Sequence, residues 1–190
     1  MRLNLTINKT NGLRMKKAYL ASGCFWCTET IFDNVDGVTK VIPGYMGGTK
    51  TNPTYEEVCT GLTGHAELVE ITYDSNLVSF KKLLEVFFKT HDPTTLNRQG
   101  NDIGTQYRSA IFYQNKNELN VAKEFISSLE SSNVFSNKIV TTLEKKTEFF
   151  EAEDYHKNYF YNNPENMYCY RNNFYDNLQP RKILFFSLVL

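Results

Sequence analysis

The chain has 190 residues, with 21 Lys or Arg balanced by 21 Asp or Glu, and 41% of its residues are hydrophobic. This length suits one compact domain with its own core. The zero net charge argues against nucleic-acid binding, which needs a basic surface, and the 14% of aromatic residues argue against disorder. No apolar run approaches the ~20 residues of a membrane span. The first 14 residues lack the apolar core of a secretory signal, so we expect a cytoplasmic protein without membrane association.

The first half of the chain shows alternating strand and helix signals. Residues 17–22 are predicted to form a strand, residues 27–35 a helix with one apolar face, and residues 38–43 a second strand. A glycine-rich loop follows. Within it, a short helix is predicted to begin with Asn52 as its N-cap and to end at Gly61.

The middle of the chain continues this alternation. Residues 65–73 alternate as in a strand with one buried face, and Ser79 is predicted to cap a helix that runs to about residue 90. Residues 91–107 have the composition of a long irregular loop. Loops of this length are usually functional.

The last elements complete a single domain. A strand is predicted at residues 108–113, a helix capped by Asn117 runs to about residue 129, and another strand follows at residues 138–143. No glycine occurs after Gly104, and we find no repeat or linker. One α+β domain fits this order of elements best.

The cysteines are too few for a disulfide scaffold and suggest redox or metal chemistry instead. They are Cys24, Cys27, Cys59 and Cys169. Cys24 lies between a predicted strand and a predicted helix, where the positive helix end lowers a thiol pKa and favours the reactive thiolate. The alternative is a small buried cysteine beside two core aromatic residues. Cys59 lies within the short predicted helix, where we expect a buried small hydrophobic residue.

Glu67 has the strand parity of Val69, Ile71 and Tyr73, which places its carboxyl group on the buried face. Burial should raise the pKa of this carboxyl group, so that it can act as a general acid. The alternative is a carboxylate at the strand end that pairs with Arg or Lys. His65 shares the same parity, and we favour a structural histidine there.

Three polar residues in or beside the two loops, Tyr55, Asp102 and Tyr107, are weaker candidates. The Asn-Asp-Ile-Gly sequence around Asp102 is also typical of turns. Tyr55 follows Pro53 and could serve packing alone. Each residue taken singly is a weak functional signal.

Several ordered segments together resemble the A-type peptide methionine sulfoxide reductases. These segments are Gly23-Cys-Phe-Trp-Cys27, Gly44-Tyr-Met-Gly-Gly48, Asn52-Pro-Thr-Tyr-Glu-Glu-Val-Cys59, Thr63-Gly-His-Ala-Glu67, His91-Asp-Pro-Thr94, Asn97-Arg-Gln-Gly-Asn-Asp102, Gly104-Thr-Gln-Tyr-Arg-Ser109 and Ala152-Glu-Asp-Tyr-His156. The resemblance runs from about Lys17 to Cys169, which is most of the chain.

The resemblance implies a two-layer α/β sandwich around a mixed, mainly antiparallel sheet with a ferredoxin-like core. It implies reduction of the S-epimer of methionine sulfoxide, free or in oxidised proteins, with thioredoxin as the reductant. A monomer without cofactor or metal is expected. Residues 1–14 are predicted to be a disordered extension with Met15 as an alternative start, residues 15–175 the catalytic domain, and residues 176–190 a tail of uncertain structure.

Carried over by position, the resemblance implies that Cys24 is the nucleophile and Glu67 the acid that protonates the sulfoxide oxygen. The other implied site residues are the hydrogen-bond donors Tyr55 and Tyr107, the orienting residue Asp102, and the substrate-binding residues Phe25, Trp26, Gly23 and His65.

The cysteine that resolves the Cys24 sulfenic acid is open between two residues. Cys169 resembles the C-terminal resolving position of the family, and we favour it. Cys27 is the rival, because a C-x-x-C spacing at a helix start can meet disulfide geometry. Two other functions compete: a general dithiol–disulfide oxidoreductase that uses Cys24 and Cys27, and a zinc-binding module.

Overall fold

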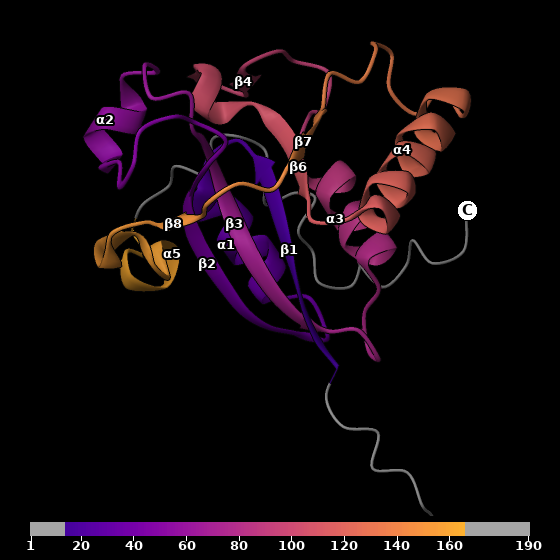
Figure 1. Cartoon of the computed structure of the whole chain (residues 1–190), viewed down its shortest axis with the longest axis horizontal. Coiled ribbons are helices and arrows are strands. Elements are labelled where there is room, and N and C mark those ends of the chain that lie inside the picture. The colour runs from indigo at the N-terminus through magenta and orange to yellow at the C-terminus, as the bar shows by residue number, and fades with distance from the viewer. Residues whose placement is uncertain (1–13, 166–190) are drawn as a thin grey trace, which may run out of the picture.

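The computed structural model describes residues 14–165, which form a six-stranded sheet flanked by helices (Figure 1). The strand order in the sheet is β7-β6-β1-β3-β2-β8. The strands of this sheet are β1 (Met15–Ser22), β2 (Val38–Met46), β3 (Ala66–Asp74), β6 (Ser109–Tyr113), β7 (Thr142–Lys145) and β8 (Phe150–Glu151). The helices are α1 (Phe25–Asp33), α2 (Tyr55–Cys59), α3 (Phe80–Thr90), α4 (Lys116–Ser131) and α5 (Tyr159–Asn162).

The centre of the sheet has the ferredoxin-like arrangement that the resemblance implied. Strands β6, β1, β3 and β2 are neighbours in that order and pair antiparallel, with α1 between β1 and β2 in the chain and α3 between β3 and β6. Only β7 pairs parallel, with β6, among the described strands of the sheet. The predictions of an α+β class and of a mixed, mainly antiparallel sheet are therefore confirmed.

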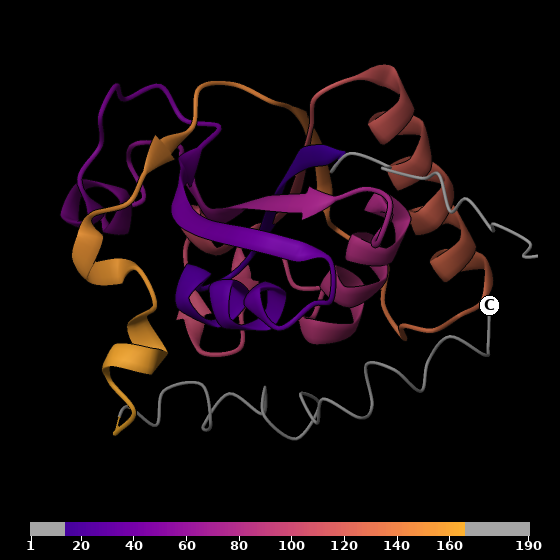
Figure 2. The ribbon, with the colours of Figure 1, turned by 90° about the horizontal axis from the view of Figure 1, so that it is seen from below.

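The main core lies between one face of the sheet and the helices. Helices α1 and α3 cover this face side by side (Figure 2), and α4 packs against α3. Apolar residues of all three helices join those of the central strands in one buried cluster. The opposite face carries a smaller cluster around Leu68 and Phe112, which Phe149 covers. Such a two-layer architecture lets each helix bury one apolar stripe.

Two predicted helix caps are wrong by two residues. Helix α2 is capped by Thr54 rather than Asn52, because Thr54 and Glu57 form a reciprocal capping box. Helix α4 is capped by Asn115 rather than Asn117, since the Asn115 side chain accepts a hydrogen bond from the Glu118 N–H at 3.0 Å. The cap predicted at Ser79 is confirmed.

Two further segments differ from expectation. The last predicted strand, at residues 138–143, is shifted: β7 begins at Thr142, and the preceding backbone instead bonds from Val140 N–H to Pro93. The segment at 91–107 is less irregular than predicted. It contains a small hairpin of β4 (Arg98–Gln99) and β5 (Asp102–Ile103), and then the 3₁₀ turn η1 (Thr105–Tyr107).

Within residues 14–165, no helix has the length and apolar character needed to cross a membrane. The predictions for the N-terminal extension, for the C-terminal tail and for Cys169 fall on residues 1–13 and 166–190, which lie outside the described residues.

Candidate active site

Cys24 is the N-cap of α1, directly after β1 and Gly23. Gly23 has a φ of +91°, and a Cβ atom there would lie 2.5 Å from Cβ of Gln99. Glycine is therefore needed both for the backbone turn and for the close approach of the 91–107 segment. The sharp turn aims the Cys24 sulfur at the backbone N–H groups of Trp26 and Cys27, as predicted.

The predicted low pKa of the Cys24 thiol is wrong. Burial raises this pKa well above its usual value, and the nearby Glu67 carboxyl raises it further. The N–H groups of Trp26 and Cys27 lower it, but they do not offset the loss of solvent. Cys24 is only 8% exposed, so its thiol remains protonated at neutral pH.

Glu67 shares the face of β3 that carries Val69, Ile71 and Tyr73, as its strand parity predicted, although the structure buries both faces of this strand. Its side chain is 1% exposed, and Oε2 accepts a hydrogen bond from the Phe25 N–H at 3.1 Å. Among the described residues, Oε1 has no hydrogen-bond partner. Burial raises the pKa of Glu67 to about 8, against the opposite effect of the Phe25 N–H. Glu67 is therefore a protonated acid at neutral pH, beside the thiol.

Two tyrosines and one aspartate lie around this pair. Burial raises the pKa of both Tyr55, at the start of α2, and Tyr107, in η1, and the charge of Glu67 contributes at both positions. Asp102 in β5 raises the pKa values of Glu67, Tyr107 and Cys24. The structure thus brings together all five predicted catalytic residues, which come from the start of α1 and from α2, β3, β5 and η1.

Phe25 and Trp26 form an aromatic cluster beside Cys24. Phe25 is 1% exposed, and its ring centroid lies 5.0 Å from His156 and 6.3 Å from Tyr55. The partly buried Trp26 indole donates from Nε1 to Nδ1 of His156 at 3.0 Å. Its ring is stacked on Tyr159, with centroids 3.7 Å apart and planes inclined by 7°. This cluster makes one side of the site apolar.

Sequence reasoning missed His156, Tyr159 and Glu153 as parts of this cluster. The Glu153 carboxylate accepts the Tyr55 N–H and the Tyr45 hydroxyl, each at 2.9 Å, and so ties α2 to β2. The segment Ala152-Glu-Asp-Tyr-His156 contributed to the resemblance, but no periodicity or spacing assigned its residues a contact. His156 meets Trp26 only through tertiary folding.

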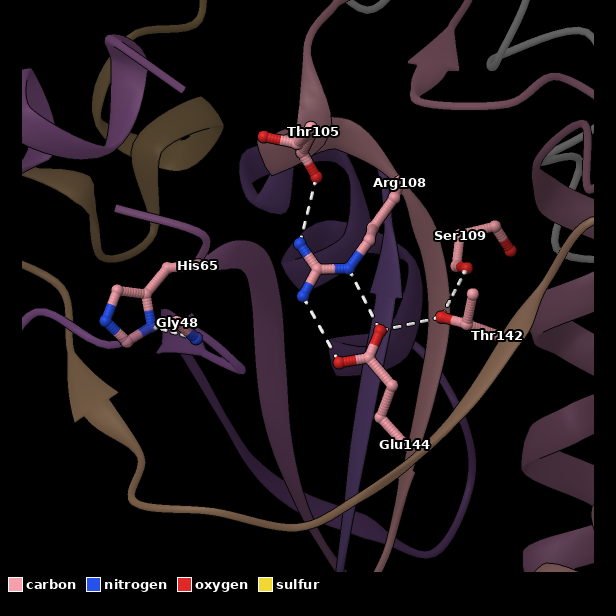
Figure 3. Close-up of polar contacts among 7 residues, drawn as sticks. All are labelled: Gly48, His65, Thr105, Arg108, Ser109, Thr142 and Glu144. Carbon is pink, nitrogen blue, oxygen red and sulfur yellow. Dashed lines mark hydrogen bonds and ion pairs between the residues drawn. The ribbon is translucent and has the colours of Figure 1, made fainter. Parts of the chain in front are cut away.

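His65 is held by the backbone (Figure 3). Its Nδ1 accepts from the Gly48 N–H at 3.0 Å, and its Nε2 lies 2.7 Å from the Lys50 carbonyl oxygen. Both ring nitrogens are therefore engaged in fixing the loop after β2. These contacts favour a structural role for His65. They give no support to the predicted contact of His65 with substrate.

Figure 3 also shows how η1, which carries Tyr107, is fixed. Arg108 pairs with both carboxylate oxygens of Glu144, at 3.0 and 3.3 Å, and donates from Nη1 to the Thr105 carbonyl. Thr142 supports Glu144 with a hydrogen bond of 2.7 Å. A bidentate pair of this kind orients the guanidinium rigidly, so the turn before β6 is tied to β7.

The cysteines differ in state and exposure. Cys24 and Cys59 are free thiols among the described cysteines, whereas Cys27 is disulfide-bonded. Cys24 and Cys27 are therefore not bonded to each other. Cys59 is exposed at the end of α2, so the prediction of a buried residue is wrong. Val58, the residue before Cys59, takes the buried position of this five-residue helix instead.

The comparisons with known proteins agree on one family. A family model described as peptide methionine sulfoxide reductase matches residues 16–182. The peptide methionine sulfoxide reductase MsrA of Saccharolobus solfataricus is 52% identical over 155 residues, which cover 82% of this chain and 86% of that protein. That of Picrophilus torridus is 55% identical over 151 residues, covering 80% and 85%. Reduced Mxr1 from Saccharomyces cerevisiae has a similar structure, with a TM-score of 0.77, 33% identity, and coverage of 87% and 94%.

Proposed function

The chain belongs to the peptide methionine sulfoxide reductase family, and we propose that Cys24 and Glu67 are the nucleophile and the general acid of its thiol-dependent reaction. One observation carries these roles. Glu67 is buried and protonated, and it accepts a hydrogen bond from the residue that follows Cys24 while its second oxygen has no partner among the described residues. The free oxygen of the protonated carboxyl group can donate a proton to the sulfoxide oxygen. The neighbouring thiol can attack the sulfoxide sulfur.

The reaction transfers one oxygen atom. The Cys24 sulfur attacks the sulfoxide sulfur, Glu67 protonates the sulfoxide oxygen, and methionine leaves as the oxygen ends on Cys24 as a sulfenic acid. The substrate sulfur is reduced by two electrons and the Cys24 sulfur is oxidised by two. The thiol proton compensates for the proton that Glu67 donates. Because both groups are neutral in the dry site, no charge is buried before substrate enters.

The surrounding side chains complete the proposed site. Tyr55 and Tyr107 donate hydrogen bonds to the sulfoxide oxygen as negative charge develops there, and Asp102 orients the site. Phe25 and Trp26 form the apolar wall for the S-methyl group. Membership of the family implies selectivity for the S-epimer, free or within oxidised proteins.

Regeneration requires a second thiol and an external reductant. We propose that Cys169 resolves the sulfenic acid, with Cys27, three residues from Cys24, as the alternative once the disulfide that holds Cys27 is reduced. Mxr1 of Saccharomyces cerevisiae has been solved in complex with Trx2. By analogy, we propose thioredoxin as the reductant of this chain, acting on a monomer in the cytoplasm, where thiols are kept reduced.

Separated epimers of methionine sulfoxide test the whole proposal. With dithiothreitol as reductant, we expect wild type to reduce the S-epimer, Cys24→Ser to reduce neither epimer, and Cys59→Ser to match wild type. Cys59→Ser is the matched control because Cys59 is the other free thiol of the described residues, and a serine hydroxyl can keep the hydrogen bond that Cys59 makes with the Tyr55 side chain. Residual sulfoxide reduction by Cys24→Ser would disprove the assignment of the nucleophile.

A further inference from the structure

Glu29 is a buried carboxylate on the helix that carries the proposed nucleophile. It lies three residues after Trp26 in α1 and is 4% exposed. Its two oxygens lie 2.9 and 3.0 Å from the backbone N–H of Asn158, and the N–H of Tyr159 also bonds to this carboxyl. Residues three apart share one helix face, so Glu29 faces the same part of the molecule as the Trp26 indole.

Burial raises the pKa of Glu29 to about 7, while the N–H groups of Asn158 and Tyr159 lower it. These two donors are therefore the main contacts that favour the charged carboxylate. Asn158 has a left-handed backbone, and its own side chain makes no cap for α5. Glu29 takes the place of that cap from 129 residues away in the chain.

The segment that Glu29 holds is the one that contacts Trp26. His156 accepts the indole N–H, and Tyr159 covers one face of the indole ring. Both residues lie within three residues of the N–H groups that Glu29 binds. The indole is thus oriented by residues 156–159, whose backbone is hydrogen-bonded to Glu29 on α1, the helix that also carries Trp26.

Because these contacts run from Glu29 through residues 156–159 to Trp26, we propose that Glu29 is a positioning residue. By holding residues 156–159, it sets the orientation of the Trp26 indole in the substrate pocket. The inference rests on the proposed role of Trp26 as a wall of that pocket. Glu29 itself contacts neither substrate nor the reacting sulfur. Its effect on catalysis runs through Trp26, and so it should appear in substrate binding rather than in the chemical step.

Trp26 is the only tryptophan of the chain, so intrinsic fluorescence reports directly on this contact. In Glu29→Gln, which keeps the size but loses the charge, we expect acrylamide to quench Trp26 at least twice as strongly as in wild type. We expect KM for methionine S-sulfoxide to rise about tenfold, with the saturating single-turnover rate within about twofold of wild type. Glu124→Gln makes the same chemical change at an exposed position of α4 and should leave all three values unchanged.

A double-mutant cycle separates positioning from a general loss of stability. Tyr159→Leu removes the ring stacked on the indole and should raise KM to a similar extent. If Glu29 acts through this segment, the variant carrying both changes should have a KM no higher than the worse single variant. If the increases in KM of the two single variants multiply in the double variant, the proposal is overturned. It is also overturned if Glu29→Gln has wild-type quenching and KM but a lower thermal midpoint. If Trp26→Leu leaves KM unchanged while Glu29→Gln still increases quenching, the role of Trp26 in binding fails but its positioning by Glu29 stands.

Discussion

The N–H of Phe25 donates to Oε2 of Glu67 at 3.1 Å, and this one hydrogen bond joins the first turn of α1 to the buried face of β3. Because Phe25 directly follows Cys24, the bond holds the carboxyl group of one element beside the thiol of another. It also occupies Oε2, which leaves Oε1 as the oxygen able to face substrate.

Replacing Glu67 with Gln should lower the single-turnover rate of sulfoxide reduction by ~10²–10³, because the developing oxyanion loses its proton donor. The amide keeps the shape of the side chain and can still accept the Phe25 N–H. Rapid-quench measurement of methionine formed in the first turnover checks this. A rate close to that of wild type would remove Glu67 from the role of acid.

The pH dependence of that rate follows from the raised pKa of Glu67. The reaction needs the protonated carboxyl, which predominates below about pH 8. As pH rises above this value, the single-turnover rate should fall about tenfold per pH unit. The decline near pH 8 should be absent in Glu67→Gln. A wild-type rate that stays constant from pH 7 to 9.5 would contradict the assignment.

The same pKa predicts an effect on stability. In the unfolded chain Glu67 ionises near pH 4.5, whereas in the folded protein it ionises near pH 8. The folded state therefore binds an extra proton between these values, and the free energy of unfolding falls as pH rises through this window. Glu67→Gln does not ionise, so its thermal midpoint should exceed that of wild type at pH 9 by more than at pH 5. Scanning calorimetry at both pH values measures this difference, and an unchanged difference would contradict the prediction.

Substitution of Gly23 by Ala should destabilise the protein by about 1–3 kcal/mol through its backbone conformation alone. The clash of the added Cβ with Gln99 would displace Cys24 further and reduce activity. Gly61→Ala is the control, because Gly61 also has a positive φ but its nearest non-neighbouring atom would lie 3.7 Å away. Urea unfolding and sulfoxide reduction should be impaired more in Gly23→Ala than in Gly61→Ala. Equal losses would show that the contact with Gln99 is unimportant.

The resolving cysteine is identified by trapping the sulfenic acid. Each fully reduced variant is given one equivalent of sulfoxide without reductant and is then treated with dimedone, which labels sulfenic acid. We expect Cys169→Ser to retain the label on Cys24, and Cys27→Ser to lose it as a disulfide forms. The reverse pattern would assign resolution to Cys27.

The sequence alone was sufficient for features that depend on neighbouring residues. The alternation of residues 65–73 placed Glu67 on the same face as Val69 and Ile71, and Ser79 marked the beginning of α3, because strand parity and helix capping are local properties. The burial of the opposite face of β3 was not predicted. The short distance between Gly23 and the predicted α1 likewise placed Cys24 at a helix start. At Asn52 and Asn117 the same local logic failed, since competing caps lay two residues away.

Only the tertiary structure decided how these groups behave. Helix position alone predicted a low pKa for Cys24, but burial of the thiol and, to a smaller extent, the nearby Glu67 carboxyl reverse the direction of the shift. The contacts of Trp26 with His156 and Tyr159, and of Glu29 with Asn158, join residues about 130 positions apart. Solvation and such contacts depend on every element packed around a group, and no local pattern in the chain contains that information.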